Sequence, residues 1–295
     1  MKHQTITPVT GNNTEYMPGR ASIEKFDYKK SEQYILSIRL SADGFSFVVY
    51  NPQHYCFLLS VTRKPDNSIS LPANLKLAFR ELTFLSYPYK KVYILVVDKR
   101  YTFIPIEIFE EAHLQELFCY NFSKKDNELI YQNTLVGNNC EVAYGIDKNH
   151  YTVISEKYPN NKCFSHSTIL TEFFSAKSRS LPSKQMFACL RDSYVDLFCF
   201  NHGRILLVNS YGECKVAMDY SYYILFVWKQ LGMDQLNDEL YILGESSQKK
   251  ELLETMKNFI ENIFEFEVEA ELGNFYSEDV ATVSHDIQIF MSQVR

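Results

Sequence analysis

The sequence predicts an α/β protein made of two similar halves, and three observations support this fold class. Each half opens with two apolar, β-rich runs around a short turn, which is the pattern of a β-hairpin. Each half then continues with a third strand, an amphipathic helix and a short apolar strand. The same elements recur in the same order at nearly constant spacing along the 295 residues. We therefore expect an internal structural duplication.

The hairpin of the first half is the clearest local signal. Its turn contains Asp43-Gly44, a dipeptide that favours tight hairpin turns. The last strand of this half is wholly apolar, which is typical of a strand buried on both faces of a sheet. Strands are expected at residues 34–40, 45–50, 55–62 and 92–97, with a helix between Leu75 and Leu85.

The second half repeats this order. Asn201 follows Asn51 by 201 − 51 = 150 residues, and Tyr241 follows Tyr93 by 241 − 93 = 148 residues. Strands are expected at residues 187–190, 195–200, 204–208 and 240–243, with a helix over 216–231.

The remaining segments divide the chain into a flexible leader at 1–30, a first lobe at 31–180 and a second lobe at 181–295. We expect a subdomain inserted in the first lobe at about 125–180. The C-terminal region predicts a helix at 249–263, a half-buried strand at 264–271 and a helix that begins near Ser277. Between the halves we expect helices around 109–118 and 169–174, strands at 129–135 and 141–146, and a linker at 175–182.

Charge and cysteine content restrict the function classes. The net charge is −6 and no basic run exceeds two residues, which argues against nucleic acid as a partner. The seven cysteines are scattered, without Cys-x-x-Cys pairs or zinc-ligand spacing. This pattern favours free thiols in a reducing compartment, so we expect a cytoplasmic protein with no metal site.

A membrane-spanning segment is not expected. The N-terminal residues are polar and do not resemble a signal peptide. The longest strongly apolar run, 220–228, is about half of the ~20 residues that a membrane-spanning helix needs. We therefore expect a protein that is not integral to a membrane.

The ββ-β-α-β-α unit, repeated with a subdomain between the copies, resembles the duplicated ribonuclease H-like units of the actin-like and hexokinase-like ATPase fold. The resemblance covers about residues 30–295 and includes the hairpin from Leu36 to Tyr50. The chain is similar to a Bacteroidetes protein family of unknown function with this fold. It is more distantly similar to actin-like scaffold proteins of pilus assembly and type II secretion. The resemblance implies two lobes with a nucleotide cleft between them.

The resemblance also implies three loops around the nucleotide. Two are Asp-x-Gly-Ser/Thr turns, in which the aspartate positions magnesium and the glycine lets backbone N–H groups approach the phosphates. The third is a Gly-Gly turn against which the adenosine lies. The residues of this chain at the corresponding positions are Asp43, Gly44, Asp192, Ser193, Gly244 and Glu245.

All three loops depart from that pattern. In the first turn Ala42 stands where a carboxylate is expected, and Asp43 is also a common residue of tight turns. In the second turn Tyr194 replaces the glycine, and its side chain would crowd a phosphate. In the third, Glu245 replaces a glycine and adds negative charge where adenosine would lie. We interpret the nucleotide cleft as vestigial.

Three functions are compatible with these residues. The first is a non-catalytic interaction or scaffold protein with an unidentified protein partner and no cofactor. The alternative is a nucleotide-binding protein or slow ATPase, with Mg²⁺ near Asp192 and ATP against Gly244. A third is a metal-dependent hydrolase, which needs several carboxylates around two metal ions; Asp43, Asp98 and Asp192 lie near strand ends.

Overall fold

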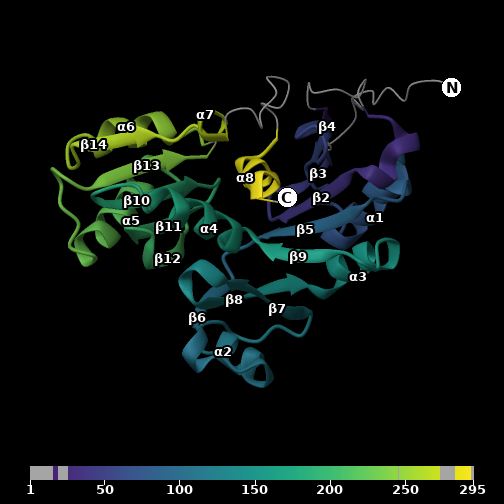
Figure 1. Ribbon diagram of the computed structural model, residues 1–295, viewed down its shortest axis with the longest axis horizontal. Helices are drawn as coiled ribbons and strands as arrows, with labels where there is room; N and C mark the ends of the chain where they lie inside the picture. Colours follow the sequence, from purple (N-terminus) through teal and green to yellow (C-terminus); the bar gives the residue numbers. More distant parts are fainter. Residues whose placement is uncertain (1–15, 19–25, 245, 273–282, 294–295) are drawn as a thin grey trace.

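The computed structural model describes residues 16–18, 26–244, 246–272 and 283–293 (Figure 1). Within these residues the strands form two large mixed sheets and a smaller third sheet. Five short 3₁₀ helices connect other elements, at Tyr28–Gln33, Thr83–Ser86, Ile106–Ile108, Glu111–His113 and Val136–Asn138.

The first large sheet contains the hairpin expected around Asp43-Gly44. The hairpin strands pair antiparallel, and Ser41 lies opposite Gly44, so Ala42 and Asp43 form the turn. β5 runs parallel to β2, and β9 runs parallel to β5. The strand order is β1 (Tyr16–Pro18), β4 (Cys56–Arg63), β3 (Gly44–Asn51), β2 (Ile35–Ser41), β5 (Lys91–Val97) and β9 (Lys162–Ser165).

The second large sheet has the order β12-β11-β10-β13-β14, which matches β4-β3-β2-β5-β9 of the first sheet. The strand directions match too, since β10–β11–β12 are antiparallel and β13 and β14 run parallel to their neighbours. The same strand order was expected from the sequence; a common origin of the two halves stays a prediction. The bounds are β10 (Lys184–Leu190), β11 (Tyr194–Asn201), β12 (Arg204–Gly212), β13 (Glu239–Leu243) and β14 (Asn262–Glu265).

The third sheet lies between the two halves in the sequence and has the order β6 (Tyr101–Pro105), β8 (Cys140–Asp147) and β7 (Glu128–Leu135), with α2 (Leu114–Cys119) beside it. It begins at Tyr101, ahead of the 125 expected for the inserted subdomain. β9 falls inside the expected range of 125–180 but pairs with β5 of the first sheet. The strands β6 and β9 are short, which makes their apolar pattern hard to recognise in the sequence.

Helices cover the sheets in layers (Figure 1). α1 (Leu71–Glu81) and α3 (Lys148–Lys157) pack on one face of the first sheet. α5 (Ala217–Gln230) and α6 (Lys249–Met256) pack on one face of the second sheet. α4 (His166–Ser178), α7 (Val268–Leu272) and α8 (His285–Gln293) share a single apolar core with the inner faces of both sheets. The two halves are therefore joined by continuous packing.

The C-terminal region differs from the sequence prediction. The helix expected at 249–263 ends at Met256, and the strand expected at 264–271 ends at Glu265. Val268 and Leu272 instead face the core from α7 at helical spacing. Over so few residues, alternation and helical spacing give similar patterns, and packing against the core decides between them. Ser277, where a helix was expected to begin, lies outside the described residues, and the observed helix α8 begins at His285.

Candidate functional site

The turn between β2 and β3 is shaped by backbone packing. Gly44 has a φ of 136°, and a Cβ at this position would collide with the backbone carbonyl of Arg63 on β4. Glycine is therefore required by the neighbouring strand. The Asp43 carboxylate accepts hydrogen bonds from the Ser41 hydroxyl and, at 3.3 Å, from Arg39 Nη1. Partial burial would raise the pKa of Asp43, but Arg39 and Ser41 together hold it below its usual value.

The turn between β10 and β11 carries Asp192 and Ser193, which are both exposed. Its backbone is closed by Arg191 N, which donates to Tyr194 O at 2.9 Å. The backbone carbonyl of Ser193 also accepts a hydrogen bond from Cys214 N at 2.8 Å. Asp192 thus stays at the surface, while the backbone around it is fixed by protein contacts.

Gly244 follows β13 and lies directly beside the second turn. Its φ is 103°, and a Cβ here would collide with the backbone of Leu190, the last residue of β10. The structure therefore brings two of the three predicted loops together, and strand packing again accounts for the glycine. Glu245 lies outside the described residues.

α8 lies between the two large sheets (Figure 1), and Asp286 in its first turn is the main polar feature there. Arg191 donates to it from Nη1 to Oδ2 at 2.7 Å and from Nη2 to Oδ1 at 2.8 Å. Arg39, on β2 of the first sheet, donates from Nε to Oδ2 at 3.1 Å. Bidentate arginine–carboxylate contacts are among the strongest hydrogen bonds in proteins. One carboxylate thus joins a strand of the first sheet to the end of β10 in the second.

A second buried carboxylate, Asp196 on β11, extends this network. It accepts hydrogen bonds from Arg191 Nε at 2.9 Å and from Ser210 Oγ at 2.5 Å. His166 Nε2, at the start of α4, lies 3.2 Å from Asp196 Oδ2. Ser210 Oγ also lies 2.9 Å from the hydroxyl of Tyr101 on β6. We call Arg39, His166, Arg191, Asp196 and Asp286 the inter-sheet network.

Pairing keeps the inter-sheet network charged despite its burial. The Asp286, Arg39 and Arg191 side chains are 3%, 8% and 15% exposed, and Asp196 is fully buried. Burial alone would raise the pKa of Asp286, but the guanidiniums of Arg191 and Arg39 lower it well below its usual value. The pKa of Asp196 is likewise lowered against burial by His166 and Arg191. Carboxylates with such low pKa values are weak bases, so this arrangement suits a structural connection better than proton transfer.

Other candidate sites receive little support from the geometry. In the residues that the structure describes, no three His, Cys, Asp or Glu side chains gather closely enough to hold a metal ion. Asp98 instead accepts a hydrogen bond from Arg100 N at 3.2 Å. None of the helices in the described ranges has both the length and the apolar character needed to cross a membrane.

The inter-sheet network was not predicted from the sequence. A signal was present, because Arg39 and Asp196 are single charges inside otherwise apolar strands. Their partners could not be predicted, since Arg39 and Asp286 are separated by 247 positions in the chain. Among the described residues of the predicted site, Asp43 is the one whose side chain is hydrogen-bonded to a member of the network, Arg39.

Comparison with known proteins identifies the fold. The chain is 42% identical to a protein of Bacteroides thetaiotaomicron described as having an actin-like ATPase fold and unknown function, with a TM-score of 0.81. That match covers 90% of this chain and 98% of the other. A distant likeness to the PilM–PilN type IV pilus biogenesis complex, at 12% identity and a TM-score of 0.52, covers 88% of this chain and 96% of that one.

These likenesses confirm the fold class expected from the sequence. No curated protein matches the chain. One family, described as "Protein of unknown function (DUF3822)", matches residues 23–263. The chain therefore has an actin-like ATPase fold and belongs to the DUF3822 family.

Proposed function

We propose that this chain is a non-catalytic interaction or scaffold protein whose nucleotide cleft is vestigial. The observation that carries this proposal is the position of Asp286 between Arg39 and Arg191. A carboxylate of the chain itself pairs with two cations, one on β2 of the first sheet and one directly after β10 of the second. The halves are thereby connected by side chains of the chain itself.

The state of the three loops supports the same conclusion. A phosphate cradle needs backbone N–H groups that a ligand can approach closely. Gly44 and Gly244 are instead packed against the backbones of neighbouring strands. Asp43 and Asp192 are both exposed, but Asp43 is paired with Arg39, which leaves Asp192 as the better candidate for magnesium among the described loop residues. Mg²⁺ in ATPase sites is held by one or two carboxylates together with the phosphates, so a single carboxylate without a phosphate cradle is a weak basis for Mg²⁺-ATP binding.

The remaining parts of the proposal concern surroundings and partner. We place the protein in the cytoplasm, where its seven cysteines would stay reduced. All seven are free thiols, and burial raises the pKa of Cys163 to about 12 and that of Cys214 to about 11. Thiols with such high pKa values react slowly, as suits structural cysteines. As an interaction protein it would act through a protein partner, without a cofactor or nucleic acid.

A titration with Mg-ATP tests the proposal. A ligand at a concentration equal to its dissociation constant stabilises a protein by about 0.4 kcal/mol, through RT ln 2. We therefore expect about 1 mM Mg-ATP to leave the Tm nearly unchanged, and calorimetry to show no saturable binding. The Asp192→Ala variant is titrated alongside, since its side chain is exposed and its loss does not disturb the inter-sheet network.

The opposite result would favour the alternative function. Micromolar ATP binding that Asp192→Ala abolishes would identify a nucleotide-binding protein. ATP turnover that is lost in the same variant would make the protein a slow ATPase.

A further inference from the structure

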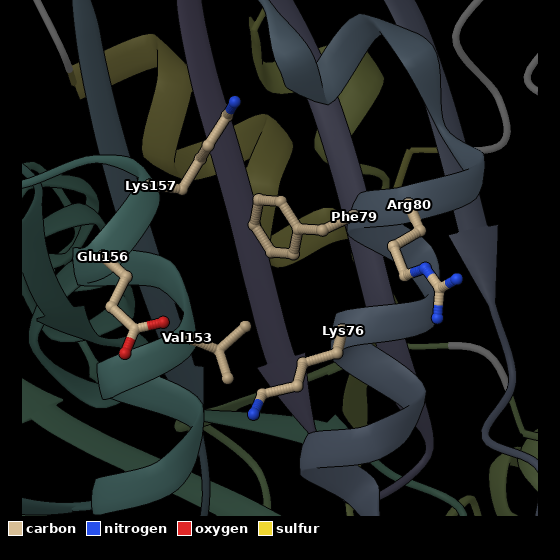
Figure 2. A pocket seen from close by; sticks show the side chains of 6 residues that line it. All are labelled: Lys76, Phe79, Arg80, Val153, Glu156 and Lys157. Carbon is tan, nitrogen blue, oxygen red and sulfur yellow. The ribbon is translucent and has the colours of Figure 1, made fainter.

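A second site lies on the outer side of the first sheet, on the face opposite α4 and α8. It is a cavity of about 390 Å³ between α1 and α3. Cavities of this size accommodate one or two large side chains or a small ligand. Its lining consists of Lys76, Phe79 and Arg80 from α1 and Val153, Glu156 and Lys157 from α3 (Figure 2).

The floor of this cavity is apolar and firmly anchored. Phe79 and Val153 pack against the core of the first sheet. The Phe79 ring makes an edge contact with Phe47 at 6.3 Å and lies 6.1 Å from the ring of Tyr158. Both helices are fixed at their N-termini, since Ser70 caps α1 and Asp147 caps α3. The cavity is therefore a feature of the folded chain itself.

The rim of the cavity is positively charged. Lys76, Arg80 and Lys157 are exposed, and they form no ion pair with another described residue. Glu156 is the single carboxylate in the lining, so the rim carries three cations against one anion, in a chain whose net charge is −6. Figure 2 shows Lys157 and Lys76 pointing towards opposite ends of the gap, with Phe79 between them. The order across the gap is cation, apolar surface, cation.

We propose that this cavity, here called the α1–α3 pocket, binds an acidic segment of a partner protein. A large apolar side chain of that segment enters over Phe79 and Val153. Carboxylates on either side of it pair with the exposed cations of the rim. Such an apolar anchor inside a charged rim is the usual anatomy of a protein-binding hot spot. The proposal rests on the interaction role proposed above, but it uses a different surface from the inter-sheet network.

A peptide fits the α1–α3 pocket better than a polyanion does. Nucleic acids bind to extended tracks of Lys and Arg, and anionic membranes attract clusters of about four to eight such residues. Three cations around one apolar cavity form neither pattern. A ligand that presents a large apolar side chain between its charged groups, in contrast, can pack that side chain against the apolar floor.

Selection from a library of random peptides on the immobilised full-length protein tests this proposal. The most enriched peptide is synthesised with a fluorescent label, and its affinity is measured by anisotropy. We expect enriched peptides to combine Asp or Glu with a large apolar residue. Reversing the rim with Lys76→Glu, Arg80→Glu and Lys157→Glu is expected to weaken binding at least ~10-fold, because each lost ion pair at a rim lowers the association rate.

The matched control carries Lys215→Glu, Lys229→Glu and Lys250→Glu, three exposed lysines outside the pocket that give the same change in net charge. This variant is expected to bind the peptide within about twofold of the wild type if the contact is local. Equal weakening in both variants, or enriched peptides without acidic residues, would overturn the proposal. Binding of anionic phospholipid vesicles or of a single-stranded oligonucleotide in place of peptides would also overturn it. The Mg-ATP titration tests the nucleotide cleft, whereas the peptide experiment tests the α1–α3 pocket. Each of the two proposals can therefore be contradicted without the other.

Discussion

At the scale of single residues, Asp286 is the side chain on which the inter-sheet network depends. Removing one partner of a buried ion pair costs about 3–5 kcal/mol, because the remaining charge stays buried without compensation. Asp286→Ala removes the bidentate partner of Arg191 and the buried partner of Arg39, which keep only Asp196 and the exposed Asp43. We expect it to lower the free energy of unfolding by about this amount in urea denaturation. The exposed Asp192→Ala should change it by less than about 0.5 kcal/mol. A loss below ~1 kcal/mol for Asp286→Ala would contradict the importance of the network.

The same carboxylate gives the stability a defined pH dependence. The pKa of Asp286 is lowered in the folded protein, whereas an unfolded aspartate titrates near 3.9. The unfolded state therefore binds more protons as the pH falls. The contribution of Asp286 is fully present above about pH 5 and is lost progressively at lower pH. Urea denaturation at neutral and acidic pH should show a steeper decline for the wild type than for Asp286→Ala. Parallel declines would show that Asp286 is not ionised in the network.

At the scale of single residues, a local turn could be predicted from the sequence, whereas the inter-sheet network could not. The hairpin around Asp43-Gly44 was predicted because this dipeptide is a local turn signal. The pairing of Arg39 with Asp286 depends on the way that distant elements come together, which no local pattern contains. The positions expected to hold a nucleotide, such as Asp192, were chosen from a resemblance and stay a prediction.

At the scale of elements, α8 links the two sheets through its apolar side. Phe290 is buried, and its ring lies 5.3 Å from that of Tyr93 on β5 and 5.1 Å from that of Phe164 on β9. Phe290→Ala is expected to cost about 3–5 kcal/mol of unfolding free energy, because it removes a large side chain and leaves a cavity. Phe226→Ala is the matched control, since Phe226 is 42% exposed on α5. Equal effects of the two substitutions would show that α8 packs only loosely.

Elements with an uninterrupted apolar pattern were predicted well, and elements with a mixed pattern were not. The apolar strands β5 and β13 lie where the sequence placed them, because strands buried on both faces keep an uninterrupted apolar run. The helix α3 was not predicted, since it buries only Ile154 completely and its pattern is mostly polar. The strand expected at 264–271 gave way to α7, where contacts with α8 and the core override the local alternation.

At the scale of the whole molecule, the two sheets, α4 and α8 share one apolar core with the inter-sheet network beside it. Continuous packing of this kind restrains relative motion of the two halves. A nucleotide-dependent cycle would require such motion. The order of elements was enough to predict the fold, because each half repeats one simple unit. The charge pairing between the halves could not be predicted from the sequence. The proposal that nucleotide binding has been lost rests on this pairing.

The most direct measurement is a crystal structure of the protein grown with an excess of Mg-ATP. The account predicts that Asp286 remains bound to both Arg39 and Arg191, with no nucleotide beside the β2–β3 and β10–β11 turns. It would be contradicted by ATP bound between these turns, with the two arginines on its phosphates and Asp286 displaced.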